Sequence, residues 1–284
     1  MILRPKTPAE WVKQILLWTP LVLFVIWTLT PLLWSLSASF KPVLELYRAP
    51  PTLIPRDPTL QNFMVVFSAS NFPYYFGNSV FLAVGSTLIT LVVSTLGAYS
   101  FARYAYPFRH ILLLFVLVPR IIPRAALVVP LYQLFSRMGI LNTYTVLLIS
   151  YTATAVPMST WILAGFFKGI PYSLEENARL DGAGLFLILR KIMIPMALPG
   201  VIAVIVVAGV QSWNEFPFVL SFTNSAQMRT LPYQLYLLRD ALGVQDWSVI
   251  NAFSMVTIIP VVVVFFIFQK RVISGLVSGA IKGE

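Results

Sequence analysis

The chain has 284 residues, of which 58% are apolar and only 11% are charged, and its formal net charge is +10. Soluble globular domains carry about 25% charged residues, so this composition excludes a protein whose surface lies mostly in water. The absence of cysteine excludes disulfides, a thiolate catalyst and a cysteine-ligated metal site, and the basic residues lie between apolar stretches without forming a patch for nucleic acid.

Six apolar runs follow one another, each long enough to cross a bilayer as a helix of about 20 residues. They lie near residues 14–36, 76–100, 110–135, 144–167, 192–222 and 249–269. We therefore expect an all-α integral membrane protein. A single transmembrane domain would cover residues 14–272, between a short N-terminal segment (1–13) and a C-terminal tail (273–284).

Orientation follows from the lysines and arginines of the loops, because short cytoplasmic loops carry an excess of both. With the N-terminus inside, 12 of the 20 Lys and Arg residues fall in inner segments and six in outer loops. This bias predicts that both termini and the polar segment at residues 173–191 are cytoplasmic.

The polar segment separates the fourth apolar run from the fifth. Ser173 and Glu176 have the S-x-x-E spacing of a capping box, which predicts a short helix from about residue 174 to residue 180. Glycines at 182 and 184 permit a turn after it. We expect the helix to display Glu175, Glu176 and Arg179 to another protein; a solvated loop is the alternative that composition alone leaves open.

Two arginines lie inside the third run, where a charge at mid-span costs about 2.5–3.5 kcal/mol on insertion scales. Arg120 and Arg124 are four residues apart, so they share a face in a continuous helix. Prolines at 119, 123 and 130 are expected to kink or unwind that helix. Either the arginines line a polar path and bind a hydroxylated or anionic solute, or they pair within the helix bundle.

Trp213, Asn214 and Glu215 lie toward the outer half of the fifth run. Sugar sites combine aromatic faces with amide and carboxylate groups, which makes these residues candidates for the same path. Tryptophan also favours the membrane interface, and Glu215 is an alternative partner for either arginine.

The polar segment resembles the signature loop of ATP-binding-cassette (ABC) importer permeases, which reads E-A-A, three residues, G, about nine residues, I, then L-P. The matching residues are Glu176-Asn177-Ala178, Asp181-Gly182-Ala183-Gly184, Ile192, Pro195 and Pro199. The chain departs from the signature at Asn177, where the family has alanine, and at Leu189, where an aromatic is common.

Further motifs, in family order over nearly the whole chain, resemble the carbohydrate branch, the maltose or trehalose kind. They include Pro31-Leu32-Leu33-Trp34, Asn78-Ser79, Ala98-Tyr99 with Ala102-Arg103, Pro130-Leu131-Tyr132, Trp213-Asn214-Glu215-Phe216 and Gly279-Ala280-Ile281-Lys282-Gly283.

The resemblance implies a type I ABC importer permease fold in a bacterial or archaeal inner membrane. It also implies a second homologous permease, two ATPase subunits and an extracytoplasmic binding protein as partners. The polar segment would be a coupling helix docked on an ATPase, with a second contact from the tail at Gly279, Lys282 and Gly283. The coupling residues would be Glu175, Glu176, Ala178, Asp181, Gly182, Ala183 and Gly184.

The chain has no G-x-x-x-x-G-K-[ST] phosphate loop. We therefore expect a transport subunit without a cofactor or metal of its own, with ATP and Mg used by the partner ATPases. The expected cargo is a di- or oligosaccharide, with glycerol phosphate or another polyol as the alternative. Gln61-Asn62, in the first outer loop, is a candidate contact for the binding protein.

An ion-coupled secondary transporter is the alternative of a different class. It would need inverted repeats and a mid-membrane acidic site. Glu215 is the one acid near the interior of an apolar run, and this alternative leaves the polar segment unexplained.

Overall fold

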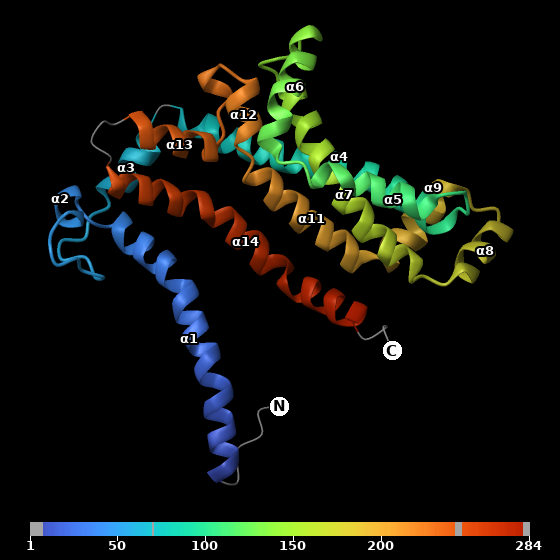
Figure 1. Cartoon of the computed structure of the whole chain (residues 1–284), viewed down its shortest axis with the longest axis horizontal. Helices are drawn as coiled ribbons and strands as arrows, with labels where there is room; N and C mark the ends of the chain where they lie inside the picture. The colour runs from blue at the N-terminus through green and yellow to red at the C-terminus, as the bar shows by residue number, and fades with distance from the viewer. Residues whose placement is uncertain (1–7, 70, 242–245, 281–284) are drawn as a thin grey trace. The chain divides into compact units, whose positions relative to one another are not determined.

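The computed structural model describes residues 8–69, 71–241 and 246–280, and every regular element in this part of the chain is a helix (Figure 1). Two bent helix pairs bring the number of candidate membrane spans to between four and six. The four unbroken ones lie in α1 (Pro8–Ser39), α4 (Phe72–Arg103), α7 (Tyr144–Lys168) and α14 (Trp247–Ala280). The expected all-α membrane protein is confirmed at this level.

The third apolar run is broken. α5 (Arg109–Leu117) continues into the 3-10 turn η1 (Val118–Arg120), and α6 (Arg124–Arg137) leaves the break at 92°. Pro119 and Pro123 flank the break, and each lacks the backbone N–H that a continuous helix needs. The expected unwinding is confirmed. The two arginines do not share one helical face, because Arg120 ends η1 and Arg124 begins α6 beyond the bend.

The fifth apolar run is broken as well, with a bend of 84° before α11. α9 (Leu185–Ile188) precedes the run and leads into a π-helical turn η2 (Leu189–Met193), and α10 (Ile194–Met196), α11 (Leu198–Trp213) and α12 (Pro217–Phe222) follow. Pro199 lies in the first turn of α11, where its missing N–H is tolerated. The apolar run predicted as a span over residues 192–222 is therefore bent and interrupted, not one straight helix.

The chain forms two compact units. One is built from the chain up to Ala69 and from Leu238–Val256; the other runs from Ser70 to Leu237 and continues from Thr257. α13 (Leu231–Ala241) and α14 each contribute to both units.

In the larger unit, α4 packs along α7, and α11 lies against both helices (Figure 1). Small hydroxyl side chains on α4, among them Ser86, Thr90 and Ser94, are buried. Ser86 Oγ donates a hydrogen bond of 2.8 Å to Ser212 Oγ on α11. Small residues let membrane helices approach closely, and their hydroxyls then bond across the interface.

In the smaller unit, a polar network organises the loop between α1 and α3 (Gln61–Ser68). Glu45, in α2 (Val43–Leu46), is buried and accepts hydrogen bonds from Thr52 Oγ1 at 3.0 Å and from the backbone N of Arg56 at 2.9 Å. Asn62 is 5% exposed and donates to the backbone oxygen of Ser39, the last residue of α1, and to that of Lys41 just after it. The side chain of Asn62 is therefore not available to a binding protein, whereas Gln61 is exposed and stays a candidate contact.

Candidate functional site

The polar segment forms α8 (Tyr172–Leu180) and the turn that follows it, beyond the end of α7 (Figure 1). α8 begins directly after Pro171, and no side chain caps its first turn. The predicted capping box is wrong because the helix starts before Ser173, which lies inside the first turn. The predicted turn is confirmed: Gly182 has φ +83°, a conformation that favours glycine.

Glu175 does not face solvent, and its expected display to a partner is wrong. Its side chain is 1% exposed and forms an ion pair with Arg103, in which Glu175 Oε2 lies 3.0 Å from Arg103 Nε. The side chain of Arg103 is itself only 6% exposed. Arg179 Nη2 donates to the same carboxylate at 2.8 Å, and the hydroxyl of Tyr99 donates to it as well. Tyr99 and Arg103 belong to the last turns of α4, so the carboxylate joins α8 to α4.

The arginines of this cluster make further contacts. Arg103 Nη2 donates to the backbone oxygen of Ile170 at 3.0 Å and lies 3.7 Å from Met193 Sδ. Arg179 Nη2 donates to Tyr99 Oη at 3.1 Å. This hydrogen bond and the one to Glu175 raise the pKa of Arg179, which keeps the guanidinium charged.

The outward side of α8 and its turn remains exposed. It presents Glu176, Asn177, Leu180, Asp181 and Gly182, with Leu180 86% exposed. Ala178 and Ala183 are half-buried against the apolar core at this end of α4 and α7. Gly184 precedes α9 and is exposed. Sequence reasoning missed Leu180 as a large apolar group on this surface.

A second cluster joins the two helix breaks. Arg124 Nη1 lies 2.5 Å from Glu215 Oε2, and the side-chain exposures are 38% and 2%. The backbone N of Phe218 donates to the other oxygen of Glu215 at 3.3 Å. Glu215 is therefore a partner of Arg124, one of the alternatives that the sequence left open.

Arg120 and Arg124 also line one cavity of about 470 Å³ between η1, α6 and α7. Arg120 Nη1 donates to Gln211 Oε1 at 3.5 Å, and Gln211 Nε2 donates to Thr154 Oγ1 at 3.1 Å. The cavity thus sets two guanidinium groups and the hydroxyl-bearing side chains of Ser150 and Thr154 in a wall that is otherwise apolar.

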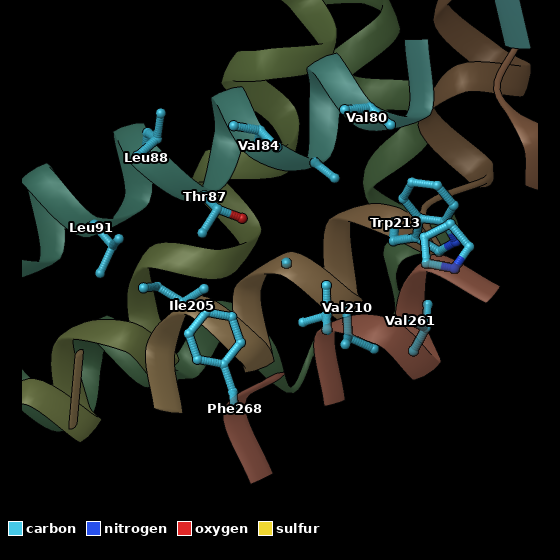
Figure 2. A pocket seen from close by; sticks show the side chains of 14 residues that line it. Val80, Val84, Thr87, Leu88, Leu91, Ile205, Val210, Trp213, Val261 and Phe268 are labelled. Carbon is cyan, nitrogen blue, oxygen red and sulfur yellow. The ribbon is translucent and has the colours of Figure 1, made fainter. Parts of the chain in front are cut away.

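Trp213 lies elsewhere, in a cavity of about 320 Å³ between α4, α11 and α14 (Figure 2). The walls of this cavity are aliphatic and aromatic apart from Thr87, and Trp213 Nε1 donates to the backbone oxygen of Thr257 at 3.2 Å. Such a lining offers little to sugar hydroxyls. Asn214 is exposed and donates to its own helix, at Val210 O. The structure therefore unites Arg120, Arg124 and Glu215 but not Trp213.

The expected tail contact falls largely outside the described residues. Gly279 lies in the last turn of α14, while Lys282 and Gly283 are outside. Within the described part of the chain, no group of three His, Asp or Glu side chains has a geometry that could hold a metal ion.

Residues 94–277 match the family described as "Binding-protein-dependent transport system inner membrane component". The chain belongs to this family. The match covers more than half of the chain and includes α8, its turn and both broken spans.

Curated relatives agree with the family. A sulfoquinovosyl glycerol transport system permease protein of Agrobacterium fabrum is 36% identical over 90% of this chain and 89% of its own. A trehalose/maltose transport system permease protein of Thermococcus litoralis is 34% identical over 97% and 99% of the two chains.

A solved structure has the same fold. It belongs to a bacterial ABC transporter involved in the import of the acidic polysaccharide alginate, with a TM-score of 0.80 at 20% identity over 94% of this chain and 99% of that one.

Proposed function

We propose that this protein is the permease subunit of an ATP-driven, binding-protein-dependent importer and forms half of the path for a carbohydrate. The observation that carries the proposal is the exposed surface of α8 and its turn in a chain of this family. The relatives named as permeases for sulfoquinovosyl glycerol and for trehalose or maltose support a carbohydrate as cargo.

The proposed topology has six spans, both termini in the cytoplasm and α8 at the cytoplasmic face of a bacterial or archaeal inner membrane. Each bent pair then counts as one span. The excess of Lys and Arg in the inner segments supports this orientation.

The partners proposed for the chain are a second homologous permease, two ATPases that use ATP and Mg, and an extracytoplasmic binding protein. Glu176, Asp181 and Gly182 would contact the ATPase directly, because they are exposed. Ala178 and Ala183 would support that surface from the core side. Glu175 would act from inside by fixing the helix.

The cavity at Arg120 and Arg124 is the proposed part of the cargo path. Its guanidinium groups and hydroxyls suit the polar rim of a sugar. The same two arginines would also suit glycerol phosphate or another charged polyol, which remains the second candidate cargo.

The test is uptake by lipid vesicles that contain the complex purified through this chain. We expect accumulation of a labelled oligosaccharide that requires ATP and the cargo-loaded binding protein and that survives collapse of the ion gradients. Competition by glycerol phosphate would identify the alternative cargo. Uptake driven by an ion gradient without any ATPase subunit would contradict the proposal and favour a secondary transporter.

A further inference from the structure

α8 has only a small apolar contact with the core, through the half-buried Ala178, where a surface helix is ordinarily attached by a wide apolar stripe. Among its nine residues, Glu175 is the one that is buried. The attachment of α8 therefore depends on this carboxylate and on its partners at the end of α4, Tyr99 and Arg103.

Arg103 fixes three segments at once. Its guanidinium pairs with Glu175 of α8, donates to the carbonyl of Ile170 in the connection from α7, and touches Met193 in the π-helical turn. The Glu175 carboxylate accepts hydrogen bonds from Tyr99 and Arg179 and lies 3.0 Å from Arg103 Nε. A buried carboxylate held in this way favours one geometry, because moving it away from these groups leaves a charge unpaired in an apolar surrounding. α8 is therefore held to α4 as part of one body.

The other end of α4 carries a similar polar attachment. Asn78 Nδ2 donates to the backbone oxygens of Gln227 at 2.6 Å and Arg229 at 2.9 Å. The hydroxyl of Ser79 accepts a hydrogen bond of 2.9 Å from the backbone N of Leu231. Both side chains are buried, so the loop before α13 is fixed to the start of α4.

An unbroken helix joins the two attachments. From Ser79 to Tyr99 it rises about 30 Å, at 1.5 Å per residue. Neither bent pair has this continuity, since each is interrupted by more than 80°. α4 is thus the one element of the described larger unit shown to be attached by buried polar side chains both to α8 and to the loop at residues 227–231.

We infer that α4 is a rigid connecting rod between the ATPase side and the outer side of the importer, with Tyr99, Arg103, Glu175, Asn78 and Ser79 as its positioning residues. Movement of α8 is passed to the loop at residues 227–231, and contact of a loaded binding protein with that loop is passed back to α8. The inference rests on the proposed function and adds the route by which its two faces communicate.

Matched pairs of variants test the rod. Tyr99→Phe removes one hydroxyl from the Glu175 cluster, and Tyr104→Phe removes an exposed hydroxyl five residues away. Ser79→Ala removes the acceptor for Leu231, and Ser94→Ala removes a buried hydroxyl that bonds within α4 itself. The readout is the stimulation of ATP hydrolysis by cargo-loaded binding protein in the purified complex.

We expect Tyr99→Phe and Ser79→Ala each to lower the stimulation by about fivefold or more, the lower end of ordinary coupling between sites. Tyr104→Phe and Ser94→Ala should keep it. The double variant Tyr99→Phe, Ser79→Ala should lose little more than either single variant, because a rod released at one end no longer transmits.

Equal stimulation of ATP hydrolysis within each matched pair would contradict the proposed role of α4. So would a loss of stimulation in the double variant that equals the sum of the two single losses. The two tyrosine variants keep every charge and both rings, so their comparison tests the role of α4 even if Ser79→Ala does not fold. A wild-type complex that contains no ATPase would instead overturn the proposed function, and the rod with it.

Discussion

Two buried carboxylates show how differently the same kind of ion pair is used in this protein. Glu175 is enclosed by Arg103, Arg179 and Tyr99, and the side chain of Arg103 is only 6% exposed. Glu215 has one cationic partner, Arg124, which is 38% exposed and faces a cavity. The closed cluster fixes one geometry, whereas the open pair leaves a guanidinium accessible to a solute.

The largest expected effect comes from opening the closed cluster. Arg103→Ala removes the buried cation beside the Glu175 carboxylate and leaves the half-exposed Arg179, which should lower the free energy of unfolding by about 3–5 kcal/mol. Thermal unfolding of the purified chain in detergent measures this. Arg179→Ala, which removes an exposed partner of the same carboxylate, is the control and should cost much less. Equal losses of unfolding free energy in Arg103→Ala and Arg179→Ala would contradict the larger role given to the buried arginine.

A smaller effect is expected at the open pair. Arg124→Ala deprives Glu215 of its cation but leaves the hydrogen bond from Phe218 N, so the loss should be about 1–3 kcal/mol. Transport should fall with it, while Arg124→Lys should retain part of both. If Arg124→Ala is as stable and as active as the wild type, the ion pair between Arg124 and Glu215 contributes to neither stability nor transport.

Removing the other arginine of the cavity should leave stability nearly unchanged. Arg120 is exposed, and in the part of the chain that the structure describes its hydrogen bond is to Gln211. Arg120→Ala should therefore raise the cargo concentration needed for half-maximal uptake by about tenfold, equivalent to one charge-assisted hydrogen bond of 1.4 kcal/mol. Normal uptake by this variant and by Arg124→Ala, in folded complexes, would exclude the cavity from the cargo path.

The smallest effect concerns a third buried carboxylate, that of Glu45 in the smaller unit. The backbone N–H of Arg56, together with Asp57 N, Thr52 and Lys41, lowers its pKa below the ordinary 4.5. The stabilisation of the folded loop by the ionised Glu45 carboxylate is therefore complete above pH 4.5 and is lost as the pH falls through the lowered pKa. Hydrogen exchange at Arg56, corrected for intrinsic rates, should accelerate in that acid window. Glu45→Gln should show fast exchange already at neutral pH; a pH-independent wild type would refute this.

The sequence predicted the apolar helices and the position of the turn at Gly182, because both depend on local composition and backbone freedom. It also indicated where prolines interrupt the third run. The 92° bend at that break could not be predicted, since a proline removes a hydrogen bond but does not set the direction in which the chain continues.

The burial of Glu175 was beyond local reasoning for a similar reason. Its partners Tyr99 and Arg103 lie more than 70 residues earlier, and helical spacing reveals only neighbours on the same helix. Arg103 follows the second apolar run, where an arginine can reach the membrane interface without an acidic partner, so its position gave no signal of the pair with Glu175.

The most direct test of the central claim is ATP hydrolysis by the complex in lipid, with and without cargo-loaded binding protein. Glu176→Ala removes an exposed acid from α8, and Gly182→Pro forbids the φ of +83° on which the turn depends. We predict that both variants still carry the ATPase but lose the stimulation that loaded binding protein produces in the wild type. Unchanged stimulation in both variants would contradict a coupling role for α8.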